Sequence, residues 1–135
     1  MIPKSNAQAG LQILETVQQP TRTYHWDIEK DRIRGYTDGQ IAMKQSNYHI
    51  LMTERYQHVI YSWNYGVELA ELFGKPRNYC VPEIERRVSE ALLYDERNMA
   101  VDTFAFDLEE RDTVAARFLV HTIFGDIEMD LEVPI

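Results

Sequence analysis

Several features that point to particular functions are missing from this chain of 135 residues. No apolar stretch approaches the roughly 20 residues that a membrane-spanning helix requires, and the polar start lacks the apolar core of a secretory signal. The single cysteine, Cys80, cannot form an internal disulfide, so nothing indicates an oxidising compartment. We therefore expect the chain to fold and remain in the cytoplasm, or to leave it only as part of an assembly.

Sequence motifs for catalysis and cofactor binding are also absent. The chain contains no Gly-rich phosphate loop, no G-x-S-x-G and no H-E-x-x-H. A nucleophilic Cys80 would need an adjacent base and a lowered pKa, so a buried thiol is the simpler expectation. The four histidines lack the spacing of zinc ligands; they are His25, His49, His58 and His121. We expect neither a cofactor nor a metal.

Carboxylate pairs of the kind that glycosidases use do occur, for example Glu54 with Glu68 and Asp95 with Glu96. With 22 acidic residues among 135, such pairs arise by chance and carry little weight. A small hydrolase that uses Glu54 or Asp95 is therefore kept only as an alternative to a non-enzymatic protein.

The chain lacks an excess of basic residues, since 14 Lys and Arg oppose 22 Asp and Glu and give a net charge of −8. Acidic and basic side chains balance over residues 1–94, so the whole excess lies in residues 95–135. An acidic C-terminal third repels phosphates, and we expect neither a nucleic-acid nor a membrane partner. The charge indicates either a solvated sheet face or a docking surface for a basic protein partner.

The N-terminal part of the chain is expected to form an arm, a hairpin and a helix. Residues 1–20 are polar and are interpreted as an N-terminal arm, followed by one domain at residues 21–135. Apolar and polar residues alternate between positions 23 and 36 around a polar turn, which predicts the hairpin. Asp38 can cap a helix that runs to about Thr53. Its predicted inward face is formed by Ile41, Tyr48, Leu51 and Met52.

The segment from residue 54 to residue 74 is the most aromatic part of the chain. Aromatic clusters are more often core or interface than cofactor contacts. We expect a short strand at residues 59–61, a turn at 64–66 and a helical piece at 67–73 that Gly74 stops.

A second long helix is expected to start near Pro82, because proline suits the first turn of a helix, and to run to about Tyr94. Its predicted inward residues recur at helical spacing and are Ile84, Val88, Ala91 and Leu92.

After this helix the pattern changes to a period of two, which predicts an antiparallel three-strand meander with turns at residues 109–112 and 125–126. In the last strand apolar residues alternate with acidic ones; the apolar set is Ile127, Met129, Leu131 and Val133, and the acidic set is Glu128, Asp130 and Glu132. The predicted fold class is α+β, with an N-terminal hairpin, two main helices and this C-terminal meander in a single domain.

An ordered series of short motifs runs through the chain. It includes Asp-Gly-Gln-Ile-Ala-Met-Lys-Gln at residues 38–45, Ile-Tyr-Ser-Trp-Asn-Tyr-Gly at 60–66 and Glu-Ala-Leu-Leu-Tyr-Asp-Glu-Arg at 90–97. In order and spacing the series resembles the XkdS-type baseplate proteins of PBSX-like defective prophages. These are similar to the small baseplate wedge proteins, or sheath initiators, of contractile-tailed phages. The resemblance covers residues 2–135 and implies a non-enzymatic structural component of a phage tail or tail-like particle.

In that wider family a Glu-Pro-Arg motif after the second long helix contacts the core bundle of the baseplate wedge. The matching residues are Asp95, Glu96 and Arg97, where the acid and the arginine are kept in kind and Glu96 replaces proline. The resemblance therefore implies a wedge contact at these three residues. The residues alone leave the alternative that Arg97 is a cation that stabilises the C-terminal end of the helix.

The resemblance also implies that the C-terminal sheet starts the tail sheath by joining strands of sheath subunits. The residues implied in this strand augmentation are Ile127, Glu128, Met129, Asp130, Leu131 and Glu132. The implied partners are other baseplate wedge proteins and the tail sheath protein. The implied location is the bacterial cytoplasm during assembly and the tail baseplate in the particle.

Alternatives remain at this stage. The acidic residues of the last strand can simply protect an ordinary sheet edge. Some relatives carry a lysozyme name, which keeps a small cell-wall hydrolase as one alternative function, and a cytoplasmic adaptor on the same fold is another.

Overall fold

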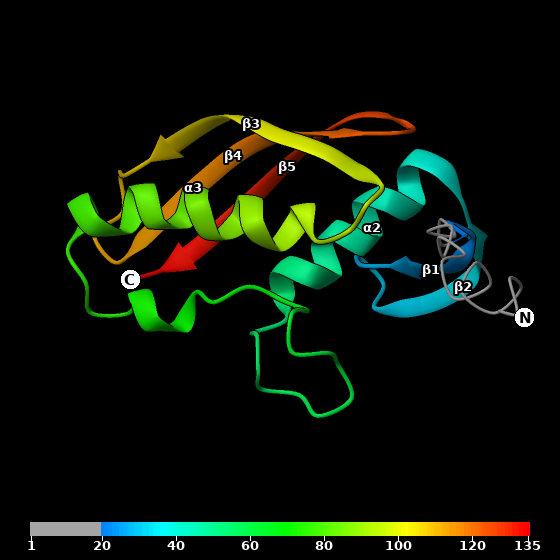
Figure 1. The fold of residues 1–135 in the computed structure, drawn as a ribbon, viewed down its shortest axis with the longest axis horizontal. Coiled ribbons are helices and arrows are strands. Elements are labelled where there is room, and N and C mark those ends of the chain that lie inside the picture. The colour runs from blue at the N-terminus through cyan, green and yellow to red at the C-terminus, as the bar shows by residue number, and fades with distance from the viewer. Residues whose placement is uncertain (1–19) are drawn as a thin grey trace, which may run out of the picture.

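The computed structural model describes residues 20–135, so that all of the predicted N-terminal arm except Pro20 lies outside the described residues. The bounds of the elements are Thr23–Asp27 (β1), Arg32–Thr37 (β2), Gly39–Met52 (α2), Ala70–Leu72 (η1, a 3₁₀ turn), Arg77–Leu93 (α3), Asn98–Asp107 (β3), Thr113–Thr122 (β4) and Gly125–Pro134 (β5). This set of a hairpin, two long helices and a meander agrees with the predicted α+β class (Figure 1).

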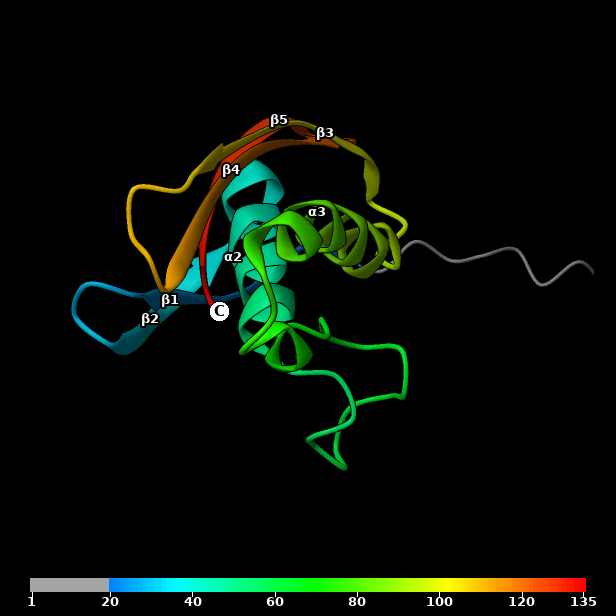
Figure 2. The same ribbon diagram turned by 90° about the vertical axis from the view of Figure 1, so that its left-hand side faces the viewer.

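A three-stranded antiparallel sheet in the order β3-β4-β5 forms one layer of the fold. Figure 2 shows this sheet curving over α2 and α3, which both lie on its concave side. Buried side chains from both layers meet there; they include Met43, Ile50, Ile84, Val88, Leu92, Val114, Phe118, Val120 and Val133. Since burial of apolar surface is the main stabilising contribution, this contact between the layers determines how the elements are placed.

The β1–β2 hairpin is attached to α2 through one glutamine. The backbone N–H of Trp26 donates to Oε1 of Gln45 (2.9 Å), and Nε2 of Gln45 donates to the carbonyl of Tyr24 (2.8 Å). The indole of Trp26 also stacks on the imidazole of His49, with 5.0 Å between ring centroids. The Gln45 amide therefore takes the place of a neighbouring strand along part of β1.

Helix α2 begins and ends where the sequence predicts, but only part of the predicted face is buried: Leu51 is buried and Tyr48 packs against the core. Asp38 is the N-cap, with its carboxylate accepting from the Gly39 N–H at 2.7 Å. Of the predicted inward residues, Ile41 and Met52 are each 63% exposed. The buried residues are Ala42, Met43, Asn47, Ile50 and Leu51.

The polar residue on the buried face of α2 explains this difference. Nδ2 of Asn47 donates to Oδ1 of Asn98 (3.2 Å), and Nδ2 of Asn98 donates back to Oδ1 of Asn47 (2.8 Å). Nδ2 of Asn98 also donates to the Leu92 carbonyl at 2.8 Å. Because both amides are satisfied, a helix face that includes the polar Asn47 can be buried.

The predictions for residues 54–74 are partly wrong. Residues 59–61 form no strand, and the predicted helix at 67–73 is reduced to the short turn η1. The predicted turn at residues 64–66 is displaced towards the N-terminus, since the Tyr65 N–H donates to the Ser62 carbonyl at 3.1 Å and closes a turn over residues 62–65. The loop is closed at its base by the Val67 N–H, which donates to the Thr53 carbonyl at 2.9 Å. In Figures 1 and 2 the loop extends away from the sheet.

Helix α3 begins at Arg77, five residues before the predicted start at Pro82. Pro82 therefore lies inside the helix, where it removes the donor to the Asn78 carbonyl. Both residues are exposed, so water can satisfy that carbonyl. The predicted inward face of α3 is confirmed, since Ile84, Val88, Ala91 and Leu92 are all buried.

The meander follows the predicted alternation along its last strand. Ile127, Met129 and Val133 are buried, and the three acidic residues between them are exposed. The predicted turn at residues 125–126 is displaced, because Gly125 already belongs to β5 and pairs with Thr122. Ile123 and Phe124 form the turn, and the Thr122 hydroxyl donates to the Gly125 carbonyl at 2.6 Å. The side chain of Thr122 thus supplies a hydrogen bond that shapes the turn.

Candidate functional site

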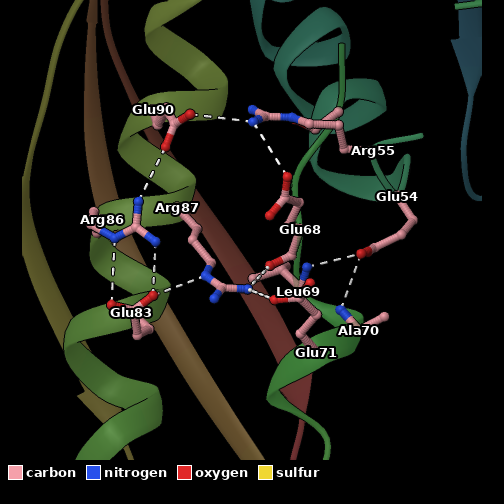
Figure 3. Close-up of polar contacts among 11 residues, drawn as sticks. Glu54, Arg55, Glu68, Leu69, Ala70, Glu71, Glu83, Arg86, Arg87 and Glu90 are labelled. Carbon is pink, nitrogen blue, oxygen red and sulfur yellow. Dashed lines mark hydrogen bonds and ion pairs between the residues drawn. The ribbon is translucent and has the colours of Figure 1, made fainter. Parts of the chain in front are cut away.

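The residues proposed for a hydrolase are engaged in structural contacts. The carboxylate of Glu54 accepts from the backbone N–H groups of Leu69 (3.3 Å) and Ala70 (3.2 Å), at the start of η1 (Figure 3). Glu68, its predicted partner, lies 3.7 Å from Nη1 of Arg55 instead. Glu54 therefore caps a turn, and the two carboxylates do not face each other as an acid–base pair.

A network of ion pairs connects this segment with α3 (Figure 3). Arg55 reaches Glu90 at 3.2 Å, and Arg87 reaches Glu83 at 3.0 Å and Glu71 at 3.3 Å. Hydrogen bonds from Arg86 and Arg87 lower the pKa of the Glu83 carboxyl. Because each of these arginines has carboxylate partners, the network fixes residues 54–71 against α3.

Cys80 is buried, as expected, and its Sγ lies 3.6 Å from the carbonyl oxygens of Leu72 and Lys75. Burial raises the pKa of this thiol despite the charges of Arg87 and Lys75. The protonated form is therefore favoured, which is the opposite of what a nucleophile requires.

Metal and membrane sites do not emerge from the described part of the chain. Among residues 20–135, no group of three or more His, Cys, Asp and Glu side chains is arranged to hold a metal ion. Within the same residues no helix is long and apolar enough to cross a membrane.

The first candidate surface lies in the turn between α3 and β3. Nη2 of Arg97 donates to Oδ2 of Asp95 at 2.7 Å, and Nε of Arg97 and its backbone N–H each donate to Oδ1 at 3.0 Å. The two side chains are only 14% and 15% exposed, whereas Glu96 is exposed. The structure thus brings Asp95 and Arg97 together as partners of each other.

Electrostatics favour the charged form of this pair. Burial raises the pKa of the Asp95 carboxyl, but the hydrogen bonds and charge of Arg97 outweigh it, and the net pKa lies below its usual value. The hydrogen bonds that Arg97 donates to Asp95 raise the pKa of Arg97. A fixed, charged pair of this kind holds the turn in one conformation.

Exposed apolar side chains flank this ion pair. The Ile123 N–H donates to the Arg97 carbonyl at 3.1 Å, so the β4–β5 turn lies beside the α3–β3 turn. The exposed apolar residues of the two turns and of the adjoining ends of α3 and β3 are Leu93, Tyr94, Met99, Ile123 and Phe124. We call this the corner surface. An apolar surface around a fixed ion pair is typical of a protein contact.

The second candidate surface is the outer edge of β5. The Ile135 N–H donates to the Asp112 carbonyl at 2.8 Å, and β4 and β5 pair without a register shift. Backbone groups along an antiparallel strand point alternately towards and away from the neighbouring strand. Gly125 is bonded to Thr122 next to the two-residue turn, so the odd-numbered residues of β5 bond to β4. The backbone groups of Glu128, Asp130 and Glu132 therefore point away from β4, and within the described residues no strand pairs with them.

This edge has two ends that the sequence analysis missed. Nε2 of Gln40 donates to the carbonyl of Asp126 at 2.7 Å, which occupies the edge at the start of β5. At the other end Pro134 has no N–H to offer. The sequence contained a signal for one end only, because Pro134 interrupts an otherwise regular strand. The bond from Gln40 could not be predicted, since Gln40 is 86 residues from Asp126.

The edge of β3 is less suitable for pairing. Its register with β4 shifts twice, between Asn98 and Ala100 and between Asp102 and Ala105. Thr103 lies between these ladder positions with a φ of 57°, a conformation that a β-branched residue rarely adopts. Bulges of this kind interrupt an edge and discourage further strands.

A third exposed surface lies at the tip of the loop after α2, where the sequence analysis expected a strand. Val59, Ile60 and Trp63 are 102%, 86% and 74% exposed. The rings of Tyr56 and Trp63 pack edge to face, with 5.0 Å between centroids. The tip of the aromatic segment is thus exposed, whereas Val67 and Leu72 near its end are buried in the core and Tyr65 packs against it. No signal in the sequence indicated an exposed loop, because residues 56–67 contain no charged residue and such a segment is normally expected to be buried.

Comparison with known proteins gives two findings. The contractile injection system sheath initiator family matches this chain over residues 19–125. The protein named "Phage-like element PBSX protein XkdS" of Bacillus subtilis (strain 168) is 34% identical over 124 residues, which make up 89% of this chain and 87% of that protein.

Proposed function

The chain belongs to the contractile injection system sheath initiator family, and on this basis we propose that it starts tail-sheath assembly by pairing β5 with a strand of a sheath subunit. The family makes the chain a structural component of a contractile tail. The finer proposal concerns residues 127–132. One observation carries it: the outward backbone groups of Glu128, Asp130 and Glu132 form a regular, unpaired edge.

Main-chain pairing suits an assembly role. Backbone hydrogen bonds bind an incoming strand without requiring one particular sequence. Exposed carboxylates on the same residues keep copies of the free protein from pairing with each other, because like charges would lie side by side. The edge is therefore available to a different chain and protected from its own.

The corner surface is the proposed contact with the baseplate wedge. We propose that Asp95 and Arg97 hold the turn in shape, while Glu96 and the apolar residues around it touch the partner. This differs from a direct contact through all three residues, because Asp95 and Arg97 already satisfy each other. The baseplate of the assembled tail is the location that follows, with assembly in the bacterial cytoplasm.

A non-enzymatic role fits the contacts of the predicted catalytic residues. The Glu54 carboxylate accepts two backbone N–H groups, and the Asp95 carboxylate is bound by Arg97. Neither carboxylate is free to act as a general acid or base, so we do not propose cell-wall hydrolysis.

Proline substitution tests the role of the β5 edge. Asp130→Pro removes one outward N–H and leaves the ladder with β4 unchanged, because that N–H points away from β4. The matched control Asp130→Ala removes the same carboxylate and keeps the N–H. We expect tails that carry Asp130→Pro to lack sheath and tails that carry Asp130→Ala to have it, as counted by electron microscopy of induced cells.

Two further measurements make this test decisive. Circular dichroism of the purified Asp130→Pro variant must show a folded domain, whereas Met129→Pro should unfold it because Met129 bonds to β4. Normal sheath on tails that contain folded Asp130→Pro protein would overturn strand pairing at β5.

The corner surface is tested by baseplate incorporation. Tyr94→Ala with Met99→Ala removes two exposed apolar side chains and should prevent incorporation into purified particles, measured by mass spectrometry. Ile33→Ala on the hairpin, which is exposed to a similar degree, is the control and should be incorporated normally. Equal incorporation of both variants would show that the corner surface is not the wedge contact.

A further inference from the structure

We propose that the strand accepted by β5 is amphipathic, with basic side chains on the outer face of the sheet alternating with apolar side chains on the inner face. This inference rests on the proposed pairing of β5 with a partner strand and specifies the chemistry of that partner. It follows from the charges on one face of β5, the apolar side chains on the other face and the length of the open edge.

The outer face of β5 carries only acidic side chains between its turn and Pro134. They are Asp126, Glu128, Asp130 and Glu132, all exposed. On the β4 side, Nε of Arg117 lies 3.0 Å from Asp130 and 3.4 Å from Glu128, and His121 bonds to Asp126. Among the described residues, Glu132 has no ion-pair partner. The carboxylates of β5 thus form a row whose cationic partners all lie on β4. On the side of β5 away from β4, nothing in the described residues neutralises their charge.

A strand placed beside β5 would bring its own outward side chains next to this row. Side chains directly opposite each other in neighbouring strands interact, and unlike charges stabilise the pair while like charges destabilise it. Lysine or arginine at the positions opposite Glu128, Asp130 and Glu132 is therefore favoured, and aspartate or glutamate there is excluded.

The inner face of β5 requires apolar side chains in the partner strand. Ile127, Met129 and Val133 are buried, but Leu131 is only partly buried. Leu131 lines an open cavity of about 770 Å³, whose other walls include Tyr48 and Met52 of α2 as well as the charged residues Asp107, Arg117, Asp130 and Glu132. Met52 is largely exposed to this space. Inward side chains of an added strand would lie beside Leu131 and cover the apolar part of this cavity.

The open part of the edge limits the length of the strand. The carbonyl of Asp126 is already bonded to Gln40, and Pro134 lacks an N–H. Residues 127–133 lie between these ends, so the partner strand spans about five to seven residues, with three of them able to exchange backbone bonds with Glu128, Asp130 and Glu132.

A second copy of this chain does not fit the same edge. Pairing β5 with β5 would place Glu128, Asp130 and Glu132 of each copy near one another, and this repulsion is not relieved by any basic residue of β5. Arg117 is the single arginine or lysine in residues 113–134. The positive charge that would neutralise the carboxylates of β5 is therefore expected from the partner strand.

Synthetic strand peptides test the inference on the purified full chain. The probe is acetyl-Lys-Val-Lys-Val-Lys-Val-Lys-amide, and its counterpart has glutamate in place of every lysine. We expect the lysine peptide to shift the backbone amide signals of Glu128, Asp130 and Glu132 in NMR titrations. We expect its binding to be at least about tenfold tighter than that of the glutamate peptide, because three cross-strand charge pairs change sign.

Two controls separate strand pairing from simple attraction of charge. A lysine–proline alternating peptide has the same charge but cannot pair as a strand, and it should not shift the β5 amides. The variant Glu128→Lys with Asp130→Lys should reverse the preference in favour of the glutamate peptide. Shifts confined to β3, or equal binding of the lysine–proline peptide, would overturn the inference.

The outcomes also distinguish this inference from the proposed function. Equal binding of the lysine and glutamate peptides at β5 would overturn the charge preference while leaving strand pairing intact. If neither peptide binds, the inference of an amphipathic partner strand is overturned. The proposed pairing of β5 with a sheath strand is then tested separately, by counting sheathed tails that carry Asp130→Pro.

Discussion

Asp95 and Arg97 bind each other across the turn that joins α3 to β3, with Nη2 of Arg97 2.7 Å from Oδ2 of Asp95. The backbone N–H of Arg97 donates to the same carboxylate, and the Arg97 carbonyl accepts from Ile123 in the β4–β5 turn. Two of the residues for which the sequence predicts a partner contact therefore hold the turn between α3 and β3 in its conformation.

Removal of Arg97 should destabilise the domain. Arg97→Ala leaves a largely buried carboxylate with only its backbone donor, and we expect a loss of about 2 kcal/mol in the free energy of unfolding. Urea denaturation followed by circular dichroism measures it. The exposed neighbour variant Glu96→Ala should stay within about 0.5 kcal/mol of the parent chain. An unchanged midpoint for Arg97→Ala would mean that the ion pair contributes nothing to folding.

The Asn47–Asn98 pair should show strong coupling. Asn47→Ala removes a partner from a buried amide and should cost about 1–3 kcal/mol. The double variant Asn47→Ala with Asn98→Ala should cost less than the sum of the single changes, because the second change removes a group that the first left unsatisfied. Additive losses in urea denaturation would contradict a direct interaction. Asn64→Ala, in the exposed loop, is the control.

Gly66 should tolerate no side chain. Its φ is +100°, and a Cβ built there would lie 2.5 Å from the Thr53 carbonyl oxygen. Gly66→Ala must displace the backbone at the base of the loop, and we expect a loss of about 2–4 kcal/mol. At Gly35 the φ is also positive, at +65°, but nothing lies within 4 Å of a built Cβ. Gly35→Ala should therefore cost only about 1 kcal/mol. Thermal unfolding of the two purified variants and the parent chain measures both losses. Equal losses for the two variants would show that the contact with Thr53 has no effect.

His121 should make stability depend on pH. Its Nδ1 lies 2.7 Å from Asp126 on β5 and its Nε2 lies 2.9 Å from Asp102 on β3. Hydrogen bonds with Asp126 and Asp102 raise the pKa of His121 above its ordinary value of 6.5, and the bond with Asp126 has the larger effect. The folded chain therefore binds this proton more tightly than the unfolded chain. The resulting stabilisation is complete below about pH 6.5 and is lost as the pH rises through the folded-state pKa.

The pH effect is measured by urea denaturation between pH 5.5 and 8.5. We expect the stability of the parent chain relative to His121→Gln to decrease as the pH rises across this range. A difference that stays constant over the range would contradict a protonated His121 between the two carboxylates.

The local patterns of the sequence predicted the elements whose signals are contained within one segment. The N-cap Asp38, the inward face of α3 and the alternation along β5 all agree with the structure. In each of these cases the deciding interaction lies within a few residues of the chain or follows from a simple period. Pro82 misplaced the start of α3 because a proline exposed to solvent is tolerated inside a helix.

Predictions failed where the deciding partner is far away in the sequence. The buried face of α2 depends on Asn98, which is 51 residues from Asn47. The expected strand at residues 59–61 has no neighbouring strand to pair with, so an apolar run became an exposed loop. The role of Gln40 depends in the same way on a distant contact, since Asp126 is 86 residues away.

The sequence by itself determined the fold class, the acidic outer face of the last strand and the family to which the chain belongs, because periodicity, composition and motif order are properties of the linear chain. Only the tertiary structure decided which sheet edge is open and where it ends. That outcome depends on the uninterrupted register of β5 with β4, on the bulges of β3 and on the bond from Gln40 to Asp126. These features arise from pairing between distant segments, which no local pattern of residues specifies.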